Sequence, residues 1–110
     1  MDTLNQYQQI IENILREHAA IPYSYGDVQR YVVFDREGCH YLLMAVGWDR
    51  NRVYHPVIHV DIINGKFWVQ YDGTEYGVAR ELADAGVPKD HIVLAFREPE
   101  IRPYTEYAAA

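Results

Sequence analysis

The dipeptide Asn64-Gly65 constrains the fold of this chain more than any other feature. Asn-Gly between two runs of alternating apolar residues is typical of the two-residue turn of a β-hairpin. Such a turn sets the pairing of the two strands, from Ile63 opposite Lys66 outward to His59 opposite Gln70 and Ile58 opposite Tyr71. The predicted core face carries Ile58, Val60, Ile62, Phe67, Val69 and Tyr71. The opposite, mixed face carries His59, Asp61, Lys66 and Gln70.

The rest of the chain predicts an α+β domain built around this hairpin. Apolar residues at helical spacing predict a first helix, turn signals separate four strands, and Gly86 with Pro88 predicts the end of a second helix that begins near Thr74. The fold class is therefore a mainly antiparallel sheet of four or five strands packed with two helices. The predicted elements are a helix at 3–19, a loop at 22–27, strands at 28–34, 39–46, 53–63 and 66–71, a helix at 74–85, a strand at 92–96 and an extended tail. The strand at 39–46 is apolar on both faces, so we expect both of its faces to be covered.

Size and charge narrow the classes of function. The 110 residues predict a single domain, 1–110, and the net charge of −6 disfavours direct nucleic-acid binding, which depends on Lys and Arg. The only cysteine, Cys39, has no partner for an internal disulfide. The N-terminus lacks the apolar stretch of a secretion signal, and no apolar run is long enough to span a membrane. A cytoplasmic protein is expected.

The titratable residues do not form a recognisable catalytic motif. His55, His59 and Asp61 are expected on one face of a strand, but the two histidines are then roughly 13 Å apart, too far to share an ion. His59 with Asp61 provides two ligands at most, and a hydrogen bond from His59 to Gln70 explains these residues equally well. Cys39 lacks a neighbouring base, because His40 points to the opposite face of a strand. We predict no catalytic residue, no bound metal and no cofactor.

The mixed face of the hairpin is too apolar for a surface that simply faces water. It also carries Val57, Ile63 and Trp68, and Trp48 and Tyr54 lie near the loop before the third strand. Large aromatic side chains of this kind are typical anchors of protein interfaces. We therefore expect the first helix, a second copy of the chain or a partner protein to cover this face.

Several ordered segments resemble the XisI family. They are Val46-Gly47-Trp48-Asp49, His59-Val60-Asp61-Ile62 with Asn64-Gly65-Lys66, Gln70-Tyr71-Asp72-Gly73-Thr74-Glu75, and Ala85-Gly86-Val87-Pro88 before Ile92-Val93-Leu94-Ala95-Phe96. The resemblance spans nearly the whole chain. It implies a controlling factor for excision of the fdxN element, a DNA rearrangement in cyanobacteria that a separate site-specific recombinase carries out. It also implies an XisH-like protein, which resembles a nuclease-fold protein, as the partner.

The family supplies no catalytic residues to transfer, so its matched positions are candidates for a shared contact surface only. Asp72, Thr74 and Glu75 also have a plain structural explanation, as a turn and the start of a helix. The candidate interaction surface comprises Trp48, Asp49, Arg52, His59, Asp61, Trp68, Gln70, Asp72, Thr74 and Glu75.

Four hypotheses of function remain open from the sequence. The first is a binding module that self-associates, docks on the XisH-like partner and acts on DNA only indirectly. The second is an immunity or antitoxin-like protein whose acidic surface neutralises a nuclease-like partner by charge complementarity. The third is a small metal-dependent hydrolase that uses His59, Asp61 and Glu75. The fourth, direct DNA binding as an excisionase, is disfavoured by the net charge.

Overall fold

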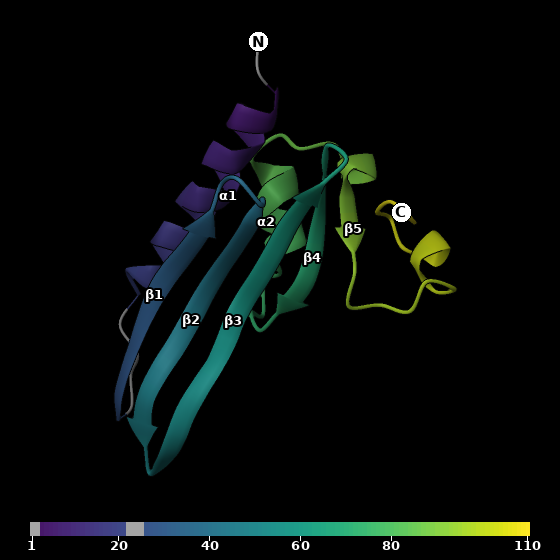
Figure 1. Cartoon of the computed structure of the whole chain (residues 1–110). Helices are drawn as coiled ribbons and strands as arrows, with labels where there is room; N and C mark the ends of the chain where they lie inside the picture. The colour runs from purple at the N-terminus through teal and green to yellow at the C-terminus, as the bar shows by residue number, and fades with distance from the viewer. Residues whose placement is uncertain (1–2, 22–25) are drawn as a thin grey trace.

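The chain folds into one twisted five-stranded sheet with two helices packed against it (Figure 1). The structure is a computed structural model that describes residues 3–21 and 26–110. The elements are α1 (Thr3–Ala19), β1 (Asp27–Asp35), β2 (His40–Asp49), β3 (Asn51–Ile63), β4 (Lys66–Asp72), α2 (Val78–Asp84), β5 (Ile92–Leu94) and short 3₁₀ turns at Lys89–His91 and Arg102–Tyr104. Most of the predicted loop at 22–27 lies outside the described residues, and Asp27 already belongs to β1.

The strands lie in the sheet in the order in which they occur in the chain. β1 to β4 form an antiparallel meander, and β5 pairs parallel to β4. The parallel pairing requires a crossover connection, and α2 provides it. The predicted α+β class with a mainly antiparallel sheet is therefore confirmed, including the fifth strand, although β5 ends at Leu94 and not at Phe96.

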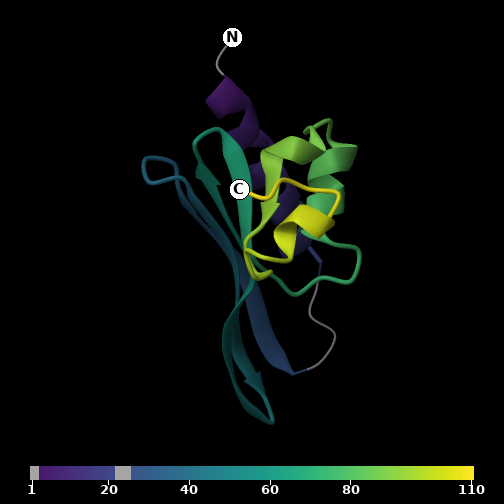
Figure 2. The same cartoon turned by 90° about the vertical axis from the view of Figure 1, so that its right-hand side faces the viewer.

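Both helices lie on the same face of the sheet, as the side view in Figure 2 shows. Their apolar side chains and the inward side chains of the strands enclose the core, whose largest members are Tyr41, Phe67, Ile11, Leu15, Leu43, Ile58 and Leu82. We call the opposite side of the sheet the open face. Leu42 and Met44 of β2 lie on it and remain partly exposed. The expectation that both faces of this strand are covered is therefore wrong, because both helices pack on one side.

The Asn64-Gly65 turn forms as predicted, and its pairing holds for four residue pairs. Asn64 and Gly65 have φ angles of 51° and 77°, as a type I′ hairpin turn requires. The pairs from Ile63–Lys66 to Val60–Val69 are observed, but the next pair is His59 with Tyr71. Gln70 is thus the extra residue of a β-bulge. The bulge moves Tyr71 to the open face, where it is 48% exposed, so its predicted place in the core is wrong.

A second bulge interrupts β3 at Val57. Leu43 of β2 pairs with Ile58, whereas the next residue, Met44, pairs with Pro56. The extra residue reverses the alternation of side chains along β3, and Val57 itself is buried. His55 then pairs with Ala45 of the core face. The predicted common face for His55, His59 and Asp61 is therefore wrong: His55 lies on the side opposite to the other two.

The second helix begins later than predicted and has a different cap. Asp72 accepts hydrogen bonds from the backbone N–H of Val78 at 2.8 Å and from the N–H and hydroxyl of Thr74 at 2.9 and 2.6 Å. Gly77 is the N-cap residue of α2, and Asp72 supplies from outside the helix the acceptor that an N-cap side chain usually provides, while Thr74 stabilises the loop before it. At the other end Gly86 has a φ of 100°, and the N–H of Val87 bonds to the carbonyl of Leu82, so the predicted Gly86 terminus is confirmed.

The turn between β1 and β2 is anchored to α1. Glu12 of α1 is only 3% exposed and accepts two hydrogen bonds from the Arg36 guanidinium, at 2.7 and 3.0 Å. Gln8 donates to the Arg36 carbonyl at 3.0 Å. A bidentate, charge-assisted pair of this kind restricts the turn that leads directly into His40, the first residue of β2.

The C-terminal tail packs beside β5 as an extended arm. Ala108 forms a parallel bridge to Val93, and its N–H donates to the Ile92 carbonyl at 2.9 Å. Val93 is fully buried, so the tail shields the end of the sheet. In the described part of the chain no helix has the length and apolarity needed to cross a membrane.

Candidate functional site: the open face of the sheet

The open face carries several large apolar side chains that are exposed to solvent. Six large apolar residues on it are between 40% and 67% exposed: Tyr31, Val33, Trp48, Tyr54, Ile63 and Tyr71. Partly exposed Leu42, Met44, Val46 and Pro56 lie between them. Figure 1 looks onto this face, and neither helix covers it. Large exposed apolar patches on soluble domains usually mark contact sites.

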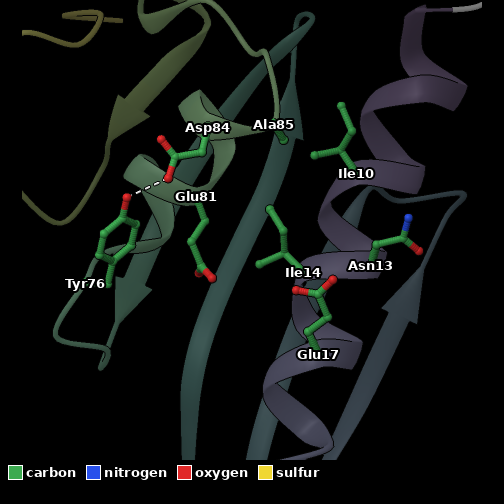
Figure 3. A pocket seen from close by; sticks show the side chains of 8 residues that line it. All are labelled: Ile10, Asn13, Ile14, Glu17, Tyr76, Glu81, Asp84 and Ala85. Carbon is green, nitrogen blue, oxygen red and sulfur yellow. Dashed lines mark hydrogen bonds between the residues drawn. The ribbon is translucent and has the colours of Figure 1, made fainter.

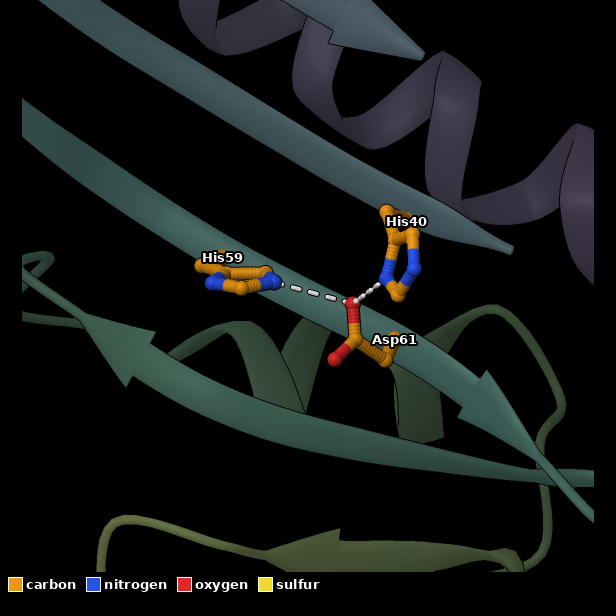
Figure 4. Close-up of side chains that lie close together, drawn as sticks. All are labelled: His40, His59 and Asp61. Atoms are coloured by element: carbon orange, nitrogen blue, oxygen red, sulfur yellow. Dashed lines mark hydrogen bonds and ion pairs between the residues drawn. The ribbon is translucent and has the colours of Figure 1, made fainter. Parts of the chain in front are cut away.

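A polar cluster lies on the same face, on β2 and β3 (Figure 4). The Nδ1 atom of His40 lies 2.8 Å from Oδ1 of Asp61, and Nε2 of His59 lies 2.9 Å from the same oxygen. Both imidazole rings therefore bond to one carboxylate oxygen, and each must present an N–H to it. We call His40, His59 and Asp61 the histidine–aspartate cluster.

Burial is uneven within this cluster. Asp61 is 8% exposed, whereas the side chains of His40 and His59 are 53% and 31% exposed. Gln70 of the neighbouring β4 donates to Oδ2 of Asp61 at 3.2 Å, so both carboxylate oxygens have partners. The hydrogen bond that His40 donates to Asp61 raises the pKa of His40, and the charges of Asp61 and Asp35 raise it further.

Sequence reasoning missed His40 as a member of this cluster. In the sequence, His40 stands out only as the neighbour of Cys39 at the start of a predicted strand. The register pairs His40 with Asp61 across β2 and β3, which brings their side chains together. The pairing of β2 with β3 depends on the Val57 bulge, and no sequence signal identified that bulge. Glu75, the third residue of the hypothetical metal-dependent hydrolase, is not part of the cluster.

The structure separates the ten candidate surface residues into three groups. His59, Asp61, Trp68 and Gln70 lie together on β3 and β4. The distal end of the β2–β3 hairpin carries Trp48, Asp49 and Arg52. There the guanidinium carbon of Arg52 lies over the Trp48 ring, 5.5 Å from its centre. Trp68 is partly covered by Arg102 of the tail, whose guanidinium carbon lies 5.6 Å from the centre of its ring.

The third group serves the start of α2. Asp72 and Thr74 are engaged with each other and with the backbone of Val78 and Gly77, and Glu75 is exposed in the same loop. Because Asp72 pairs with Ile58 of the core face, it points away from the open face. The observed contacts of Asp72 and Thr74 are those of a structural turn.

A groove of about 440 Å³ lies between the two helices, on the other side of the molecule (Figure 3). Ile10 and Ile14 form its apolar wall. Three of its polar side chains are already paired, since the Tyr76 hydroxyl donates to Asp84 at 2.6 Å and Glu81 contacts His18 at 2.7 Å. These bonds hold α2 to its preceding loop and to α1, so the polar contacts in the groove are those of a packed helix–helix interface.

Comparisons with known proteins agree on one family. The XisI protein family matches residues 1–109. The chain is similar to the crystal structure of a XisI-like protein from Anabaena variabilis, with 41% identity and a TM-score of 0.91 over 97% of this chain and 99% of that one. It is also similar to the fdxN element excision controlling factor XisI from the same organism, with 32% identity and a TM-score of 0.85 over 99% and 100% of the two chains.

A search among curated proteins gave no match. The family match spans almost the entire chain, and the two solved structures share its fold from end to end. The protein therefore belongs to the XisI family.

Proposed function

We propose that this protein is a non-catalytic accessory factor that controls excision of a DNA element through protein–protein contacts. Its immediate partner is an XisH-like protein, and a separate site-specific recombinase carries out the DNA chemistry. One observation carries the proposal: the open face presents six exposed large apolar side chains beside a polar cluster, while the helices occupy the other face.

The composition of the open face supports this proposal. Tyr, Trp, Met and Arg are enriched in the central parts of protein interfaces, and all four residue types occur on this face. Aromatic anchors such as Trp48 and Tyr54 contribute most to binding when a partner removes them from water. A solved relative is named as a controlling factor, which fits a regulatory protein better than an enzyme.

The charge of the chain supports an indirect route to DNA. The net charge of −6 opposes contact with the phosphate backbone, whereas it favours a partner with a basic surface. A partner with a nuclease-like fold has to present such a surface to bind DNA. Control of excision would then come from how this protein changes the exposure of that surface.

Co-purification of the untagged protein with a tagged XisH-like protein from the same genome tests the proposal. We expect a stable complex from the wild type, and we expect Tyr54→Lys to remove it, because a lysine there would bury an unpaired charge in the contact. Gln9→Lys, a change of equal charge at an exposed site on α1, is the matched control and should leave the complex intact. A folded wild-type protein that gives no complex at micromolar concentration contradicts the proposal.

DNA-cleavage and toxicity assays of the partner, alone and in the purified complex, separate the immunity hypothesis from the accessory one. If the XisH-like protein alone cleaves DNA or harms its host, and the complex does not, then the acidic chain acts as a neutralising factor. A harmless partner removes that hypothesis. Self-association of the chain is also expected, and the mass of the isolated protein in solution measures it.

A further inference from the structure

The histidine–aspartate cluster has a property that partner binding does not explain. Three potential metal ligands, two imidazole nitrogens and one carboxylate oxygen, lie within 4.8 Å of one another (Figure 4). Among residues 3–21 and 26–110 this is the one group of three or more histidine, cysteine, aspartate or glutamate side chains arranged in this way. It combines side chains from two paired strands, and the hydrogen bond from Gln70 on a third strand orients its carboxylate.

We propose that His40, His59 and Asp61 bind one divalent transition-metal ion on the open face. Imidazole nitrogen with carboxylate oxygen is a donor set that suits ions such as Co²⁺, Ni²⁺ and Zn²⁺, whereas Mg²⁺ and Ca²⁺ prefer oxygen alone. The inference concerns the isolated chain and does not depend on the proposed partner.

The two nitrogen–oxygen distances fit adjacent ligand positions around an ion. With metal–ligand bonds of about 2.1 Å, neighbouring ligand atoms are about 3.0 Å apart when they meet at right angles and about 3.4 Å apart in a tetrahedron. The two nitrogen–oxygen distances are 2.8 and 2.9 Å. Each nitrogen therefore lies at the distance from the shared oxygen that neighbouring positions of an octahedron require. The two nitrogens lie within 4.8 Å of each other and complete one face of the octahedron when they come to about 3.0 Å, which leaves the remaining positions to water on the exposed side of the cluster.

Only small side-chain movements are needed to admit the ion. The His40 side chain is 53% exposed and can rotate to bring its nitrogen closer to that of His59. Each ring must direct a lone pair at the ion, so the proton that it donates to Asp61 moves to its other nitrogen or leaves. Gln70 then holds the second carboxylate oxygen, the role that outer partners have at metal centres.

Titration of the tag-free, metal-stripped protein with Co²⁺, followed by visible absorption and calorimetry, tests this proposal. We expect saturable binding of one ion per chain, with weak absorption bands typical of six-coordinate Co²⁺, and no comparable binding of Mg²⁺. His40→Ala and His59→Gln should each lower the affinity for Co²⁺ by more than about tenfold. Loss of a residue that merely supports a metal ligand already lowers metal affinity by about tenfold or more, and loss of a ligand should have a larger effect. Both histidines are partly exposed, so these variants should keep the fold, which far-ultraviolet circular dichroism checks.

The matched control is His55→Ala. His55 is an exposed histidine of β3, the strand that carries His59, but it lies on the opposite face of the sheet. Its removal should leave the affinity for Co²⁺ within about twofold of the wild type. The proposal is overturned if Co²⁺ shows no saturable binding up to roughly 1 mM, the range of very weak affinities. It is also overturned if His55→Ala weakens binding as much as His40→Ala does.

Discussion

Asp72 shows how a single side chain can organise a segment that begins several residues later. Its carboxylate reaches the backbone N–H of Val78, which is the first residue of α2, and also closes the loop through Thr74. The first N–H groups of a helix have no partner within the helix, so an acceptor supplied by another element stabilises the helix start. α2 has only seven residues and therefore depends on such tertiary support.

Replacing this cap should cost measurable stability. We expect Asp72→Ala to lower the free energy of unfolding by about 1 kcal/mol, within the usual range of about 0.5–2 kcal/mol for loss of a capping side chain. Urea denaturation followed by circular dichroism measures the change. Glu75→Ala, an exposed change in the same loop, is the control and should stay within about 0.5 kcal/mol of the wild type. Equal losses in the two variants would show that Asp72 does not stabilise α2.

Residue-level contacts were only partly predictable. The sequence identified Asp72 and Thr74 as turn residues, because Asp-Gly-Thr is a local signal, but it assigned the cap to Thr74. It placed Asp61 and His59 on one face correctly, since strand alternation is also local. His40 escaped attention because its contact with Asp61 spans 21 residues and depends on the register between two strands.

At the level of elements, the two β-bulges decide which side chains reach the open face. The Gln70 bulge brings Tyr71 to that face and Asp72 to the side of α2. The Val57 bulge separates His55 from His59. A bulge inserts one residue and reverses the alternation beyond it, so every pattern-based assignment of faces fails at that point. Long helices and tight turns escape this problem, which is why α1 and the Asn64-Gly65 turn were predicted correctly.

The hairpin turn between β3 and β4 offers a test at this scale. Gly65 has a φ of 77° with open space around its α-carbon, so Gly65→Ala introduces backbone strain without a steric clash. We expect the free energy of unfolding to fall by about 1–2 kcal/mol, the cost of a left-handed conformation for a residue with a β-carbon.

Asn64→Gly provides the matched control for this turn. Glycine adopts the positive φ of 51° at this position without strain, so the variant should remain within about 0.5 kcal/mol of the wild type. Chemical denaturation of both variants measures the difference. Equal stability of Gly65→Ala and the wild type would contradict the turn geometry on which the pairing of β3 with β4 depends.

The whole molecule has two dissimilar sides. One side of the sheet is buried under α1 and α2 (Figures 1 and 2). The other presents aromatic residues, the histidine–aspartate cluster and the distal pair of Trp48 and Arg52. Antiparallel sheets commonly have one covered face and one polar, hydrated face. Here the second face is apolar over much of its area, which is the property expected of a contact surface.

The sequence predicted the class and the number of elements at this scale, but not the arrangement of the layers. Apolar periodicity shows that a strand has two apolar faces, as in β2, without showing which of them a helix covers. The side of the sheet on which α1 and α2 pack is a tertiary property. The expectation that something covers the mixed face therefore becomes a prediction about another protein molecule.

Hydroxyl-radical footprinting of the complex with the XisH-like protein tests the contact surface most directly, because radicals oxidise exposed aromatic side chains. In the free protein, Tyr31 and Tyr54 of the open face and Tyr76 of the helix side are all more than 40% exposed. We expect complex formation to lower the oxidation of Tyr31 and Tyr54 severalfold and to leave the oxidation of Tyr76 unchanged. Protection of Tyr76 with full oxidation of Tyr31 and Tyr54 would place the partner on the helices and contradict the proposed contact through the open face.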